Sequence, residues 1–225
     1  MERFMKILIT GTSTGFGKLI TETLLEEGHQ VAATMRNSQN KNKASALALT
    51  TAGATVIDLD VADDGSVALG VQDAIDALGG IDVVINNAGV SMIGLQETFT
   101  IDDWKKVFEI NVFGVQRVNR AVLPLLREQG SGLLIHISSV VGRVNLPFFG
   151  PYTASKWALE ALVEGYRAEL PGFGIESILV EPGGFPTEIF DKMSTPSDKK
   201  RVRDYGKFAN APKKFFLKFA RSLKN

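Results

Sequence analysis

The stretch that decides the fold class reads Lys6-Ile7-Leu8-Ile9-Thr10-Gly11-Thr12-Ser13-Thr14-Gly15-Phe16-Gly17. Its first five residues are mostly apolar and predict a buried strand, and its three glycines predict a tight turn into a helix. Such a turn presents backbone N–H groups and the positive end of a helix, which together hold phosphate groups in dinucleotide sites. The candidates for binding a pyrophosphate are Gly11, Ser13, Thr14, Gly15, Phe16 and Gly17.

The spacing of these glycines narrows the kind of site. Gly-x-x-x-Gly-x-Gly differs from the usual Gly-x-Gly-x-x-Gly fingerprint, and no Gly-Lys-Ser/Thr follows it, which excludes a P-loop. A glycine-rich turn that binds nothing is the alternative. The position of the turn, after a strand and before a helix, favours cofactor binding.

Short apolar runs alternate with helix-like segments along the chain. Further strands are predicted at Gln30–Met35, Ala54–Leu59, Ile81–Ile85, Leu133–Ile137 and Ser177–Val180. Helices are predicted at Lys18–Glu27, Gln39–Thr51, Asp63–Leu78, Ile101–Glu109, Asn111–Gln129 and Tyr152–Leu170. This alternation is typical of βαβ units, so we expect a single α/β domain with a doubly wound, Rossmann-like parallel sheet and helices on both faces. Residues 1–190 would form the dinucleotide-binding part, and residues 191–225 a basic lid or C-terminal segment of the same domain.

Composition limits the class of protein. Of the 225 residues, 44% are hydrophobic and 22% are charged, as in globular domains, and no apolar run is long enough to span a bilayer. The N-terminus does not resemble a secretory signal, so we expect a cytoplasmic protein. The chain has no cysteine and only two histidines, so we expect no disulfide and no metal centre. His136 lies within a predicted strand and is interpreted as a core histidine.

Charge is zero overall but unevenly distributed. Residues 199–225 hold ten Lys/Arg and one acid, Asp204, whereas residues 1–198 hold 15 basic and 24 acidic groups. The acidic body argues against a nucleic-acid partner. In the tail, Phe215, Phe219 and Leu223 recur at helical spacing with cations between them. We interpret the tail as a lid helix whose apolar side covers a substrate pocket, and contact with an anionic membrane surface is the alternative.

Polar residues follow the predicted strands at the edge where parallel sheets bind ligands. Arg36 follows strand two at the place where NAD-binding sites carry an acid. An arginine can bind a 2′-phosphate, so NADP(H) is expected ahead of NAD(H). Arg36 as a solvated loop residue is the alternative. Asp60 and Val61 could contact adenine, although a helix-cap aspartate is equally consistent. After strand four, Asn87, Ala88 and Gly89 could lie against the adenosine half of the cofactor, and a simple turn is the alternative.

Tyr152 and Lys156 are four residues apart on a predicted helix and therefore share one face. A lysine cation there would lower the phenol pKa from about 10 toward the working pH, as a general acid/base requires. Ser139 ends the strand before them and could hydrogen-bond a substrate oxygen. Residues that could line a substrate pocket, or pack as ordinary core, are Arg143, Phe148, Phe149, Phe185, Phe190 and Met193.

Taken together, residues 5 to about 190 resemble the short-chain dehydrogenase/reductase family, in the subgroup with TGxxxGxG and YxxxK. The resemblance implies a catalytic tetrad of Asn111, Ser139, Tyr152 and Lys156. Tyr152 would protonate a carbonyl oxygen as hydride arrives from the nicotinamide. Ser139 would hold that oxygen, Lys156 would also bind the nicotinamide ribose, and Asn111 would support a water leading to Lys156. The stretch after strand six resembles PGxxxT and implies cofactor contacts from Pro182, Gly183 and Thr187, the last near the carboxamide.

The resemblance implies an NADP(H)-dependent oxidoreductase that interconverts a small-molecule ketone or aldehyde and an alcohol, as a homodimer or homotetramer. A non-catalytic NADP(H)-sensing protein on the same fold is the alternative, and a nucleotide-sugar epimerase is a third reading. Members of the family usually continue into another helix and a seventh strand. If the 225 residues are the whole protein, we expect strand six to be an exposed edge of the sheet, and a truncated chain is the alternative.

Overall fold

A computed structural model describes residues 4–185, 187–189 and 192–222. Pro186, Phe190 and Leu223, which the sequence analysis included in the PGxxxT stretch, the pocket lining and the tail pattern, lie outside these residues. Within the described part, no helix is long and apolar enough to cross a membrane.

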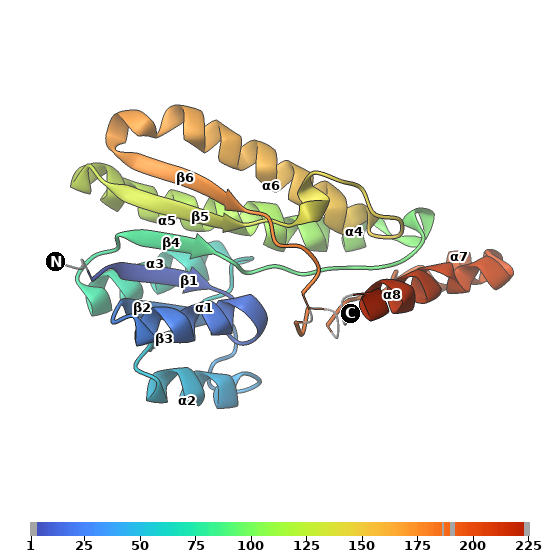
Figure 1. Cartoon of the computed structure of the whole chain (residues 1–225), viewed down its shortest axis with the longest axis horizontal. Coiled ribbons are helices and arrows are strands. Elements are labelled where there is room, and N and C mark those ends of the chain that lie inside the picture. The colour runs from blue at the N-terminus through green and yellow to red at the C-terminus, as the bar shows by residue number, and fades with distance from the viewer. Residues whose placement is uncertain (1–3, 186, 190–191, 223–225) are drawn as a thin grey trace.

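Six parallel strands form one sheet in the order β3-β2-β1-β4-β5-β6 (Figure 1). The strands are β1 (Lys6–Thr10), β2 (Gln30–Met35), β3 (Thr55–Asp58), β4 (Val83–Asn86), β5 (Gly132–Ile137) and β6 (Ile175–Val180). The direction of winding reverses between β1 and β4, and ligands bind beyond the carboxyl ends of the strands at such a switch point. The predicted doubly wound α/β sheet is confirmed.

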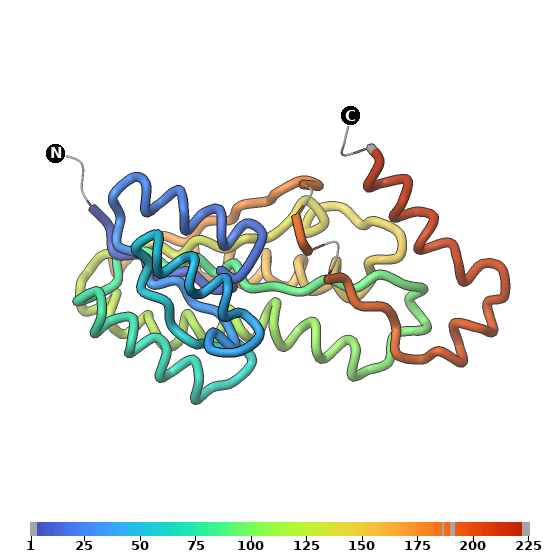
Figure 2. Tube along the Cα trace, turned by 90° about the horizontal axis from the view of Figure 1, so that it is seen from below, coloured from blue at the N-terminus to red at the C-terminus, as the bar shows by residue number. Residues whose placement is uncertain are grey.

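Helices cover the sheet on two sides (Figure 2). These helices are α1 (Gly15–Glu26), α2 (Lys43–Thr51), α3 (Asp64–Leu78), α4 (Ile101–Phe108), α5 (Gly114–Gln129) and α6 (Gly150–Glu169). Two more, α7 (Lys199–Asp204) and α8 (Ala211–Ser222), follow the last strand. Leu8 and Leu134 pack toward α3 and α5, whereas Ile7 and Ile9 pack toward α1 and α2. Each strand thus contributes alternate side chains to two apolar layers, because successive residues of a strand point to opposite faces.

Several helix bounds differ from the prediction: α1 begins three residues earlier, at Gly15, and α6 begins two residues earlier, at Gly150. Helix α2 starts at Lys43, not Gln39, because a turn precedes it: Asn37 has φ of 52°, and the Asn42 side-chain amide donates to the Arg36 carbonyl at 2.6 Å. Helices α4 and α5 are continuous, because a π-helical turn over Glu109–Phe113 joins them. Such turns are often found at functional sites, and this one carries Asn111.

Among the described residues, strand β6 is an edge of the sheet, and one of its faces is open. Ile175 and Ser177 are buried under α6, whereas Ile178 and Val180 point the other way and are 38% and 41% exposed. Figure 1 shows no helix of the described residues in front of β5 and β6. An apolar face of this kind favours association with other surfaces.

The segment after β6 crosses the carboxyl edge of the sheet before it reaches α7 and α8. Ser194 accepts a hydrogen bond from the Ile93 N–H at 3.0 Å and donates its own N–H to Ser91 at 3.2 Å. Asp103, at the start of α4, accepts from the Ser197 N–H at 2.9 Å and from the Ser197 hydroxyl at 2.5 Å. These bonds place α7 and α8 beyond the ends of the strands, away from the body of the sheet (Figure 1).

Candidate active site

A pocket of about 450 Å³ lies at the carboxyl ends of β1, β4 and β5, where the sheet reverses direction. The structure brings most of the candidate residues to its wall: Gly11, Ser13, Thr14, Gly15, Phe16, Arg36, Asp60, Val61, Asn87, Ala88, Gly89, Ser139, Tyr152, Lys156, Pro182, Gly183 and Thr187. Gly17 and Asn111 do not line the pocket themselves but contact residues that do. The site is thus assembled from segments that are far apart in the sequence.

The glycine turn lies directly against the loop after β4. The Asn87 side-chain amide donates to the Thr10 carbonyl at 2.9 Å and to the Gly11 carbonyl at 3.1 Å. A Cβ on Gly11 would lie 2.7 Å from the Ala88 Cα, and one on Gly17 would lie 2.4 Å from the Asn87 amide nitrogen. Both positions therefore require glycine, and the turn stays open toward the pocket.

The end of β2 carries more than one cation. Arg36 pairs with Asp60 at 3.5 Å, and both side chains are partly exposed. Lys41, which the sequence analysis missed, lines the same part of the pocket. The turn that holds Lys41 is fixed by Ser38, whose N–H and hydroxyl both donate to Asp58 at 2.7 and 2.8 Å. No sequence pattern marks Lys41, because its approach to the pocket depends on this turn.

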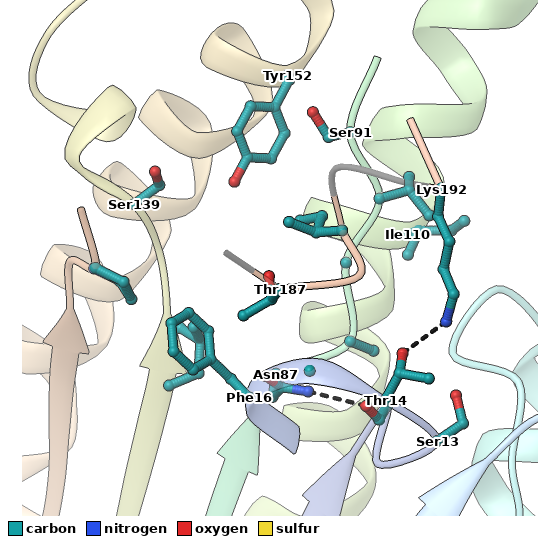
Figure 3. Close-up of a pocket in the computed structure, with 18 of the residues that line it drawn as sticks. Ser13, Thr14, Phe16, Asn87, Ser91, Ile110, Ser139, Tyr152, Thr187 and Lys192 are labelled. Atoms are coloured by element: carbon teal, nitrogen blue, oxygen red, sulfur yellow. Dashed lines mark hydrogen bonds between the residues drawn. The ribbon is translucent and has the colours of Figure 1, made fainter. Parts of the chain in front are cut away.

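Ser139, Tyr152 and Lys156 converge on one side of the pocket. Pro151 lies in the first turn of α6, where a proline fits without loss of a hydrogen bond, and the helix carries Tyr152 and Lys156 inward. The Lys156 ammonium donates to the Ile137 carbonyl at 2.7 Å and lies 5.8 Å from the centre of the Tyr152 ring. Figure 3 shows the Tyr152 and Ser139 hydroxyls facing the same space.

Burial sets the protonation of this pair. It lowers the pKa of Lys156 to about 8, although the charge of Glu160 acts in the opposite direction. It also raises the pKa of Tyr152 above its ordinary value, and hydrogen bonding to Ser139 only partly offsets that effect. The predicted lowering of the Tyr152 pKa is therefore wrong for this structure, because desolvation of the phenolate is the largest effect. A protonated Tyr152 is the form that can donate a proton.

Asn111 ties three elements together. Its amide donates to the Val90 carbonyl and to the Ser155 hydroxyl, each at 2.9 Å, and its oxygen accepts the Val90 N–H at 2.9 Å. The π-helical turn is thereby fastened both to the loop after β4 and to α6, close to Lys156. The predicted support of a water by Asn111 stays a prediction.

Two charged residues of the segment after β6 reach the glycine turn, and the sequence analysis did not include them. The Glu188 carboxylate accepts the Gly15 N–H at 3.0 Å. Figure 3 shows the bond that the Lys192 ammonium donates to the Thr14 hydroxyl, at 2.6 Å. The Gly15 N–H belongs to the first turn of α1, where a phosphate group would bind. Glu188 therefore places a carboxylate at the position predicted for a pyrophosphate.

His136 is a buried core residue, as interpreted from the sequence. Its ring lies between Asn86 at 3.4 Å and Ser177 at 3.3 Å. Burial and the nearby charge of Lys156 lower its pKa to about 4. His136 is therefore neutral and packs within the sheet next to the site. It takes no part in proton transfer there.

This sheet, with a glycine turn at its switch point and a Ser-Tyr-Lys group beside it, defines an oxidoreductase that binds a nicotinamide dinucleotide. The chain belongs to the short-chain dehydrogenase family, whose sequence profile matches residues 5–198. It is 37% identical over 211 residues to the uncharacterized oxidoreductase YusZ of Bacillus subtilis, covering 89% of this chain and 74% of YusZ. It is also 37% identical over 200 residues to the 3-ketodihydrosphingosine reductase of Bacteroides thetaiotaomicron, covering 88% of this chain and 71% of that protein.

Solved structures of relatives contain either nicotinamide cofactor. A short-chain dehydrogenase/reductase from Burkholderia phymatum in complex with NAD superposes with a TM-score of 0.78 at 29% identity, covering 85% of this chain and 70% of that one. A gluconate 5-dehydrogenase from Burkholderia cenocepacia, in complex with NADP and tartrate, gives a TM-score of 0.75 at 31% identity, covering 81% and 72%. One solved relative thus holds NAD and the other holds NADP.

Proposed function

We propose that this protein uses NADP(H) to interconvert a ketone or aldehyde and an alcohol, with Tyr152 as the general acid/base. The observation that carries the proposal is the convergence of Ser139, Tyr152 and the buried Lys156 beside the glycine turn. When bound, the cofactor supplies or accepts the hydride. Ser139 holds the substrate oxygen, and Tyr152 gives that oxygen a proton in the direction of reduction. Lys156 fixes the phenol ring and stabilises negative charge that develops on it.

The preference for NADP(H) rests on charge at the end of β2. Arg36 and Lys41 are the cations that line this part of the pocket. Asp58 is bonded to Ser38, and Arg36 pairs with Asp60 at 3.5 Å. This pair is partly exposed and therefore weak, so a phosphate can take the place of Asp60 on the guanidinium. Two cations favour the 2′-phosphate of NADP(H), and a guanidinium can bind a phosphate through two hydrogen bonds.

A paired equilibrium titration with NADPH and NADH tests this preference. We expect NADPH to bind more tightly, and Arg36→Leu to weaken NADPH binding about tenfold or more while NADH binding changes little. Lys43→Leu, a cation of the same region that does not line the pocket, is the matched control and should leave both constants unchanged. Equal affinity for the two cofactors in the unmodified protein would refute the NADP(H) preference.

Residues 191–225 act in this proposal as a lid of the same domain. The apolar side of α8 faces inward: Phe215 packs edge-on against Phe148 at 5.6 Å between ring centres, and Phe219 lines the pocket. Lys213, Lys214 and Lys218 are exposed on the other side. An inward apolar face supports the lid interpretation over membrane contact, because binding to a bilayer would need that face turned outward.

A further inference from the structure

A buried carboxylate lies one helical turn beyond Lys156 and takes no part in the proposed proton transfer. Glu160 of α6 is only 4% exposed. The Ser138 hydroxyl donates to one of its oxygens at 2.5 Å, and the Arg143 guanidinium lies 2.8 Å from the other. Arg143 also donates to Glu181 at 3.0 Å, just after β6. A buried charge requires such partners, because leaving one unpaired is strongly destabilising.

The partners of Glu160 flank Ser139. Ser138 precedes it, and Arg143 ends the short turn that follows it. A Cβ on Gly142 would lie 2.5 Å from a Glu160 oxygen and 2.9 Å from the Ser138 hydroxyl oxygen. The backbone of the turn can therefore lie this close to the carboxylate because residue 142 has no side chain. Glu160 therefore joins the turn that carries Ser139 to the helix that carries Tyr152 and Lys156. The relative placement of Ser139, Tyr152 and Lys156 therefore depends on this connection, which consists of the contacts of Glu160 with Ser138 and Arg143.

The charge of Glu160 also acts on Lys156. The groups around this lysine are Tyr152 and His136, both neutral at pH 7, and the carboxylate of Glu160. Burial raises the pKa of Glu160 above its usual value and the like charge of Glu181 adds to this, whereas the Ser138 hydroxyl and the Arg143 guanidinium favour the charged form. An anion one turn away favours the ammonium form of a lysine that burial otherwise favours as the neutral amine.

We propose that Glu160 is a positioning residue for the proposed reaction, holding the Ser139 turn on α6 and keeping Lys156 in its charged form. The proposal rests on the function proposed above. The proposal has two parts. Glu160 holds the Ser139 turn through its ion pair with Arg143, and its negative charge acts on Lys156 without Arg143. Each part has its own variant and its own measurement.

Glu160→Gln removes the charge and keeps the shape. We expect its kcat for carbonyl reduction to fall about tenfold, and the high-pH limb of kcat/KM to move about one pH unit lower. Its NADPH dissociation constant should stay within about twofold of that of the unmodified protein. Glu164→Gln is the matched control: Glu164 lies one turn further along α6 and forms an exposed pair with Arg167.

Arg143→Gln separates the two parts, because it removes the ion pair with Glu160 but leaves the Glu160 carboxylate near Lys156. We expect kcat to fall while the high-pH limb does not move to lower pH. A reading that needs no turnover is amide hydrogen exchange at Val141 and Gly142, whose N–H groups bond to Ser139. Exchange there should be faster in Glu160→Gln than in Glu164→Gln.

The outcomes are distinguishable. If Glu160→Gln matches Glu164→Gln in kcat, pH profile and exchange, the inference is wrong while the proposed function stands. If kcat falls equally in Glu160→Gln and Arg143→Gln with no shift of the pH limb, the electrostatic part is wrong. If the unmodified protein oxidises no NADPH with any carbonyl, the proposed function fails. Faster exchange in Glu160→Gln than in Glu164→Gln would still support the role of Glu160 in holding the Ser139 turn on α6.

Discussion

Lys156 and Tyr152 determine how the proposed reaction depends on pH. Burial lowers the pKa of Lys156 to about 8, so the lysine is charged below that pH and loses its proton above it. Burial raises the pKa of Tyr152, so the phenol keeps the proton that reduction consumes. Oxidation of the alcohol needs the opposite form of Tyr152, the phenolate.

The kcat/KM for carbonyl reduction should therefore fall as pH rises through about 8, following loss of the Lys156 proton. The kcat/KM for alcohol oxidation should not show this fall, because oxidation releases the proton that reduction consumes. Initial rates in both directions across the neutral and alkaline range measure this. A kcat/KM for carbonyl reduction that stays constant through about pH 8 would contradict the assignment of this limb to Lys156.

At the scale of single residues, the sequence predicted the residues fixed by local spacing. Tyr152 and Lys156 share a helix face, and the glycine turn follows a strand. The spacing of residues along the chain was enough to predict these two features. Lys41, Glu188, Lys192 and the partners of Glu160 were not. Their positions depend on a turn with positive φ, on the path of the chain after β6, and on packing between segments distant in sequence.

Among the elements, the segment that follows β6 bears most directly on cofactor binding. The Glu188 carboxylate accepts a hydrogen bond from the Gly15 N–H, and the Lys192 ammonium donates one to the Thr14 hydroxyl of the same turn. A dinucleotide that brings a pyrophosphate to this turn has to displace the carboxylate. Lys192, in contrast, is placed where it can pair with the incoming phosphate.

Glu188→Gln should therefore tighten NADPH binding about three- to tenfold, because it removes an anion that competes for a helix N-terminus and repels the pyrophosphate. Glu27→Gln is the control, since Glu27 is exposed at the other end of α1. Calorimetric titration of both variants at one salt concentration measures the change. Unchanged or weaker binding in Glu188→Gln would show that the carboxylate does not compete.

Most of the strands and helices could be predicted because apolar runs and glycine stops mark them. All six strands were placed within about two residues of their bounds. The errors have local causes: the turn held by Asn37 and Asn42 delays α2, and the π-helical turn merges two helices that the sequence separated. The path of residues 192–198 depends on side-chain bonds to Asp103, which no periodicity reveals.

For the whole molecule, the open face of β6 is the main exposed apolar feature of the sheet. Ile178 and Val180 lie side by side on it, next to β5. Both are edge-strand residues, and edges of this kind promote association between chains. A homodimer or homotetramer stays a prediction, and this face is one surface through which copies could meet.

Replacing Ile178 and Val180 together by threonine should reduce self-association while leaving the NADPH dissociation constant unchanged, because neither residue lines the pocket. Threonine keeps the β-branched shape that strands favour, so the fold should persist. Light scattering over a range of concentrations measures the association. Leu69→Thr, which alters an exposed leucine of α3, is the control. The same association in all three proteins would show that the open face does not drive it.

The central claim is that Tyr152 transfers a proton during NADPH-dependent carbonyl reduction, and one paired assay tests it. NADPH consumption is followed with a panel of aliphatic ketones, aromatic ketones and aldehydes, for the unmodified protein and for Tyr152→Phe. The account predicts turnover with at least one carbonyl, a loss of about 10²- to 10⁴-fold in Tyr152→Phe, and similar NADPH affinity in both. Retained turnover in Tyr152→Phe would contradict the mechanism. NADPH binding without turnover in the unmodified protein would instead indicate a cofactor-sensing protein on the same fold.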